Sequence, residues 1–95
     1  MIRRDGERLM LEGPVTFDTV PDLVRAAEPE LRDGSLTIDF AGVTEVDSSA
    51  VALVLEWRRQ AEHRNLALHV ANLPPSIVNL AELYGVSELL QPVAI

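Results

Sequence analysis

Residues 36–64, LTIDFAGVTEVDSSAVALVLEWRRQAEHR, contain the pattern that decides the fold. The first five residues alternate between apolar and polar side chains, which predicts a half-buried strand, and residues 41–46 are expected to form a loop. Asp47, Ser48 and Ser49 follow, and their side-chain oxygens suit the free N–H groups of a first helical turn. We therefore predict a helix that begins at Ser48 or Ser49.

The predicted helix is apolar on every side where it begins. Residues 50–55, AVALVL, contain no polar side chain, and six residues at about 100° each cover more than one full turn of a helix. The stripe that is expected to pack onto a sheet consists of Ala50, Leu53, Val54, Trp57 and Ala61. Val51 and Leu55 lie beside that stripe, so either a neighbouring helix covers them or they belong to an exposed partner surface.

Two further segments alternate in the same way as residues 36–40. Residues 6–13 place Leu9 and Leu11 on one side, and residues 66–70 repeat the pattern. Strands with one apolar and one polar face predict an α/β fold in which a mixed β-sheet has helices packed on one face. The strand, helix and strand in succession form a parallel crossover, which is expected to be right-handed.

Turn and capping residues place the elements near the N-terminus. Gly13 and Pro14 are expected to turn the chain, so that residues 15–17 return as a short antiparallel strand. Thr19 stands three residues before Asp22, which is a capping-box-like signal for a helix.

Prolines mark the end of one predicted helix and the start of another. The first helix should end or bend near Glu28, because Pro29 removes a backbone donor. Pro74 and Pro75 prepare the start of a later helix. The expected core stripe of that helix consists of Ile77, Leu80, Ala81 and Tyr84. Residues 86–95 fit either a short terminal turn or an edge strand.

Composition narrows the classes of function. The chain has 95 residues, of which 47% are apolar, so one modest core and a single domain are expected. No apolar run approaches the ~18 residues that span a bilayer, and residues 1–5 do not lead into a signal peptide, which predicts a cytoplasmic protein without membrane insertion. The formal net charge of -7 opposes direct binding to nucleic acid or anionic headgroups. The expected partner is a protein.

Asp47, Ser48 and Ser49 form the one constellation of chemical interest. An N-cap is the simplest interpretation, and a contact or phosphorylation site is the alternative, since a helix N-terminus tolerates a phosphate. An enzyme is not expected, because these serines lack a Gly-x-Ser-x-Gly elbow and His63 and His69 are placed on polar surfaces. Neither a cofactor nor a metal is expected, because there is no glycine-rich phosphate loop, no cysteine and no cluster with metal-ligand spacing.

Residues 46–54, VDSSAVALV, with LTIDFAGVT before them and a second strand after them, resemble the STAS domain family. That family includes anti-sigma-factor antagonists and domains attached to anion transporters. The resemblance covers nearly the whole chain and implies a single STAS domain over residues 1–95. Residues 80–86, LAELYGV, resemble the MlaB-type members. Those are cytoplasmic subunits of the Mla ABC transporter, which moves phospholipid between the inner and outer membranes of Gram-negative bacteria.

The resemblance implies a non-catalytic protein that binds the ATPase subunit of such a transporter, MlaF, and supports its assembly and activity. Through this ATPase the protein would contact the membrane permease and lie peripherally at the inner membrane. The resemblance also places Ser48 on the contact surface. The residues expected to bind the partner are Asp47, Ser48, Ser49, Val51, Ala52, Leu55, Glu56 and Arg59.

The alternative function is an anti-sigma-factor antagonist controlled by serine phosphorylation. In that part of the family the phosphorylated residue is the second serine of an Asp-Ser-Ser-Gly series, which corresponds to Ser49, and Ser48 is the other candidate. The chain has Ala50 in place of the glycine, which weakens this interpretation. A third class, an autonomous lipid-binding module, would need an acyl-chain pocket, for which one alternating sheet in a chain of this length leaves little volume.

Overall fold

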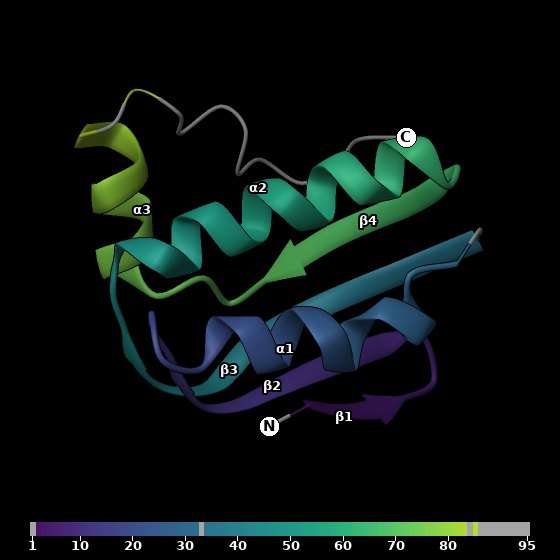
Figure 1. Cartoon of the computed structure of the whole chain (residues 1–95), viewed down its shortest axis with the longest axis horizontal. Coiled ribbons are helices and arrows are strands. Elements are labelled where there is room, and N and C mark those ends of the chain that lie inside the picture. The colour runs from purple at the N-terminus through teal and green to yellow at the C-terminus, as the bar shows by residue number, and fades with distance from the viewer. Residues whose placement is uncertain (1, 33, 84, 86–95) are drawn as a thin grey trace.

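The computed structural model describes residues 2–32, 34–83 and 85 (Figure 1). Within these residues four strands form one sheet, whose order is β1 (Ile2–Asp5), β2 (Arg8–Val15), β3 (Gly34–Val46) and β4 (Leu66–Ala71). The pair β1 and β2 is antiparallel, whereas β2 with β3 and β3 with β4 are parallel pairs. The predicted mixed sheet is confirmed.

Helices connect the parallel strands and lie on one face of the sheet (Figure 1). The described helices are α1 (Val20–Ala27), the 3-10 helix η1 (Glu28–Glu30), α2 (Ser48–His63) and α3 (Pro75–Leu83). The α-helix α1 gives way to η1 at Glu28, next to Pro29, and α2 begins at Ser48, as predicted. Among the described residues, no helix combines the length and the apolar character that crossing a bilayer requires.

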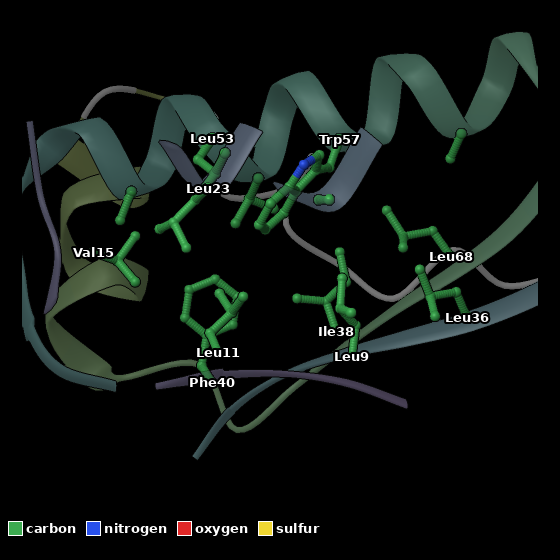
Figure 2. Close-up of a cluster of buried hydrophobic side chains, with 14 of the residues drawn as sticks. Leu9, Leu11, Val15, Leu23, Leu36, Ile38, Phe40, Leu53, Trp57 and Leu68 are labelled. Carbon is green, nitrogen blue, oxygen red and sulfur yellow. The ribbon is translucent and has the colours of Figure 1, made fainter. Parts of the chain in front are cut away.

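The hydrophobic core lies between the sheet and these helices, as Figure 2 shows. Alternate strand positions supply the buried residues Leu9, Leu11, Val15, Leu36, Ile38, Phe40, Leu66 and Leu68. The α2 helix supplies its whole predicted stripe, namely Ala50, Leu53, Val54, Trp57 and Ala61. The period-2 and period-3.6 patterns therefore placed these side chains on the correct sides.

The antiparallel pairing at the N-terminus differs from the prediction. The antiparallel partner of β2 is β1, which precedes it, and residues 15–17 do not return as a strand. The turn uses Gly6, whose φ of +62° lies in the left-handed region that glycine adopts without steric cost. Pro14 and Val15 instead pair with the end of β3. The alternation was correctly identified, but it does not reveal which neighbour a strand pairs with.

The strand β3 is longer than predicted, because residues 41–46 continue it rather than forming a loop. This second half pairs with β2 from Gly42 to Val46, with one register shift just before Gly42 and another between Val43 and Glu45. The backbones approach closely at Gly42, where an added Cβ would lie 2.9 Å from the carbonyl oxygen of Leu11. Because of this extension, Asp47 lies at the end of the sheet, beside the connection between β2 and α1.

Asp39 lies on the open face of the sheet, as its alternation predicts, yet only 5% of the residue is exposed. Burial would raise its pKa, but hydrogen bonds from Asn72, from the Ala41 N–H and from Arg8 outweigh that effect and lower the pKa. The Arg8 contact measures 2.6 Å from Nη1 to Oδ2, and the Asn72 contact measures 2.9 Å from Nδ2 to Oδ1. Asp39 therefore joins β2, β3 and the end of β4.

The later predictions fall partly within the described residues. The expected α3 stripe holds for Ile77 and Ala81, which are buried, and for Leu80, which is half-buried. Tyr84 and residues 86–95 lie outside the described residues.

Candidate functional site

Asp47 caps the N-terminus of α2. Its backbone is extended, with a φ of -137°, and its Oδ1 atom accepts a hydrogen bond from the Ser49 N–H at 2.9 Å. The Ser49 hydroxyl donates to the same carboxylate oxygen. The cap interpretation is confirmed, with Asp47 as the capping residue, and the hydroxyl of Ser49 is committed to the cap.

The second oxygen of Asp47 reaches a different part of the chain. Oδ2 accepts a hydrogen bond from the Phe17 N–H at 3.0 Å, so the carboxylate joins the β2–α1 connection to the start of α2. The hydrogen bonds from the Ser49 hydroxyl and from the Phe17 N–H lower the pKa of Asp47, because they stabilise the charged form. The carboxylate thus stays ionised and holds two surface segments at one fixed distance.

The residues proposed for partner binding fall into three groups. Ser48, Ala52 and Arg59 are exposed, and Asp47, Ser49, Leu55 and Glu56 are half-buried. Val51 is only 3% exposed, so it is not available as a surface contact. The α3 helix contacts α2 and lies beside its first turns (Figure 1), and the burial of Val51 agrees with the alternative of a covering helix. Leu55 packs against the edge of the core, so its substitution would affect folding.

Glu56 and Arg59 neutralise each other on the outer side of α2. Arg59 donates from Nη2 to Glu56 Oε2 at 2.6 Å and from Nε to Oε1 at 3.1 Å. Gln60 donates to the same carboxylate at 2.8 Å. Hydrogen bonds from Arg59 and then from Gln60 lower the pKa of Glu56 to about 2. This part of the helix carries charge in a paired form, about two turns from Ser48.

Thr19 does not form the capping box suggested by its spacing from Asp22, because its side chain makes no cap hydrogen bond to α1. Its hydroxyl oxygen instead accepts from the Thr16 N–H at 2.9 Å and lies 3.0 Å from the Pro14 carbonyl oxygen, to which it donates. Thr19 therefore organises the β2–α1 connection rather than the helix start.

Sequence reasoning missed Phe17 as a surface residue. Its residue exposure is 79%, the largest among the exposed large apolar residues of the described chain. The only sequence signal was an aromatic residue inside the turn-forming stretch from Pro14 to Asp18, and the predicted return strand obscured it.

A hollow of about 260 Å³ lies between the end of β3 and the start of α3. Its lining residues are Val43, Thr44, Glu45, Val46, Pro74 and Ser76. Among the described residues no group of three histidine, aspartate or glutamate side chains could hold a metal ion. This end of the molecule carries hydroxyl, carboxylate and apolar groups on a backbone that hydrogen bonds hold.

Comparison with known proteins gives a family and a fold. A solved structure described as "Crystal Structure Analysis of Mglu" is similar, with a TM-score of 0.58 and 20% sequence identity. The match covers 81% of this chain and 20% of that one, so the chain spans about a fifth of that protein and shares the fold of the matched part. No curated protein matches the chain significantly. The model of the family described as the MlaB STAS domain matches residues 1–92. The chain therefore belongs to the STAS domain family, in its MlaB-type group.

Proposed function

We propose that the protein is a non-catalytic STAS subunit that binds the ATPase of an Mla-type ABC transporter and supports its assembly and activity in phospholipid transport. Family membership supports this proposal, because STAS domains in general bind or regulate other proteins rather than catalyse reactions. In this role the protein is cytoplasmic and reaches the inner membrane through the ATPase and its permease.

The observation that carries the proposal is the exposed start of α2. Ser48 and Ala52 are exposed one turn apart on a helix whose first turn is held by Asp47. Small side chains on a rigid helix allow a partner to approach the backbone closely, and a preformed surface loses little conformational entropy on binding. The surface consisting of Ser48, Ala52 and the neighbouring parts of Asp47 and Ser49 is the proposed ATPase contact.

The alternative, an anti-sigma-factor antagonist controlled by phosphorylation, gains less support from the same geometry. The Ser49 hydroxyl donates to the Asp47 carboxylate, so a phosphate there would remove this hydrogen bond and place two anions side by side. Ser48 is exposed but occupies the first position of the helix, before the residue that the family resemblance marks for phosphorylation.

The test is co-purification of the tagged protein from its host, with wild type, Ser48→Arg and Glu62→Arg compared side by side. Glu62 is exposed near the other end of α2, so its variant adds the same side chain and a larger charge change. We expect wild type and Glu62→Arg to recover an ABC ATPase with its permease and Ser48→Arg to lose them. The stability cost of Ser48→Arg should stay within about 1 kcal/mol, because an exposed cation near a helix N-terminus is only mildly unfavourable.

Two results would contradict the proposal. Wild-type protein that recovers no ABC ATPase would remove the transporter role. Recovery of a small kinase-like protein, together with an added phosphate on Ser49 in the intact mass, would favour the anti-sigma-factor antagonist.

A further inference from the structure

We propose that Phe17 is the apolar anchor of the contact surface and that it enters an apolar pocket bordered by lysine or arginine side chains on the partner protein. This inference rests on the proposed function, since it takes the partner to be the transporter ATPase. It adds a residue from a separate part of the chain, the β2–α1 connection, and it states the chemistry of the surface that the partner must present.

The β2–α1 connection is rigid although its aromatic side chain is exposed. The Thr19 N–H and the Val20 N–H both donate to the Thr16 carbonyl oxygen, at 3.0 and 2.9 Å. The Thr19 hydroxyl accepts from the Thr16 N–H, and the Phe17 N–H donates to Asp47. These hydrogen bonds hold the backbone on both sides of Phe17, so little freedom of the main chain remains to be lost on binding.

The position of Phe17 is not explained by folding. A buried phenylalanine contributes apolar area to the core, whereas this residue stays 79% exposed on a connection that tertiary hydrogen bonds already hold. A single exposed apolar residue is common, but an exposed aromatic ring on a preorganised backbone has the properties of an interface anchor.

Phe17 is continuous with the proposed contact surface. Val15 pairs with Val46, so the β2–α1 connection and the start of α2 leave the sheet side by side. The Asp47 carboxylate bonds to both Phe17 and Ser49, which fixes their separation. In Figure 1 the β2–α1 connection and the first turn of α2 lie at the same end of the molecule.

The charges around Phe17 indicate what surrounds the partner's pocket. Asp18 follows Phe17 directly, and Glu45 pairs with Pro14, three residues before Phe17, so both acids lie at the same end of the sheet as Phe17. Both residues are exposed, and within the described part of the chain neither takes part in an ion pair. Unpaired acids at the end of the molecule that presents an apolar residue complement an apolar pocket with a basic rim, and this complementarity also speeds association at low salt.

The test measures the affinity of the purified full chain for the ATPase subunit of its own host, with Phe17→Ala and Leu83→Ala compared with wild type. Leu83 is a matched control, because it is also apolar and is 76% exposed, but it lies at the end of α3. We expect Phe17→Ala to weaken binding ~10-fold or more and Leu83→Ala to leave it within about 3-fold. Thermal unfolding of both variants should match wild type, since neither side chain is in the core.

A second pair of variants tests the charge of the pocket. The double variant Asp18→Asn with Glu45→Gln should bind more weakly and should show a smaller loss of affinity between low and high salt. Glu62→Gln, an exposed acid near the far end of α2, should keep both the affinity and the salt dependence of wild type.

The outcomes separate this inference from the proposed function. Binding by wild type and equally by Phe17→Ala, or an equal loss for Phe17→Ala and Leu83→Ala, would overturn the anchor and leave the ATPase partner standing. An unchanged salt dependence in the double variant would overturn the basic rim. Wild-type protein that does not bind the ATPase would overturn both proposals.

Discussion

We propose different tasks for the two sides of α2, folding for one and binding for the other, although they share one run of apolar residues. On the inner side Leu53 and Trp57 are each 1% exposed and fill the space above the sheet, as Figure 2 shows. On the outer side Ser48 and Ala52 are exposed, and Glu56 and Arg59 pair with each other. Substitutions on the inner side should therefore change stability, and substitutions on the outer side should change binding.

The N-terminus of α2 is where the two tasks meet. Asp47 supports folding because it caps the helix through the Ser49 N–H. It also accepts a hydrogen bond from the N–H of Phe17, a residue of the proposed contact surface. Asp39 offers a contrast inside the sheet: it also accepts several hydrogen bonds, but it is buried and one of its partners is the cation Arg8. The carboxylate of Asp47 thus holds two surface segments together, whereas the buried carboxylate of Asp39 joins strands of the sheet.

The largest expected effect is a loss of stability caused by a substitution on the inner side of α2. Leu53→Ala should lower the free energy of unfolding by about 2 to 5 kcal/mol, because it removes buried methyl groups and leaves a cavity. Ala52→Ser, one residue earlier on the outer side, should change it by no more than about 0.5 kcal/mol. Urea unfolding followed by circular dichroism measures both values. Similar values for the two variants would show that the two sides of α2 are not distinct.

A smaller effect on stability is expected for the helix cap, because the stabilising contribution of Asp47 depends on pH. The pKa of Asp47 is lowered in the folded state, so its charged form contributes stability that is fully present above the unfolded pKa of about 4. That contribution is lost as the pH falls through the lowered pKa of the folded state. Asp47→Asn should therefore unfold at a lower temperature than wild type at pH 7, and the difference should shrink in acid below about pH 4.

Melting curves at pH 7 and pH 3 measure this linkage, and Glu62→Gln serves as the control because that carboxylate makes no described hydrogen bond to the chain. A difference between Asp47→Asn and wild type that stays constant over this range would mean that the ionised carboxylate does not support the cap.

The smallest effect on stability is expected for the outer ion pair. Arg59→Gln should leave the melting temperature within error of wild type, because exposed ion pairs contribute little. The same variant should raise the pKa of Glu56 from about 2 toward its ordinary value, since Arg59 is the main cause of the shift. An NMR titration of the Glu56 side chain would detect this change. A pKa that stays near 2 would assign the shift to Gln60 instead.

Local patterns predicted the elements whose partners lie nearby in sequence. The start of α2 was predictable because Asp47 and Ser49 are two residues apart, and a cap depends on such short-range hydrogen bonds. The α2 stripe and the strand alternation were predictable because helices and strands repeat with fixed periods. The pairing of β1 with β2 was not, since the alternation of a strand does not encode whether its partner precedes or follows it.

The sequence by itself therefore determined the α/β class, the family, the cap and the buried side of α2, all of which depend on residue type and periodic spacing. Only the tertiary structure decided that residues 41–46 extend β3, that Val51 is buried and that Phe17 remains in solvent. These properties depend on which distant segments meet, as when Asp47 bonds to the Phe17 N–H across 30 positions of the chain. The exposure of a residue in a connection, such as Phe17, depends on the assembled surface, so no periodic pattern predicts it.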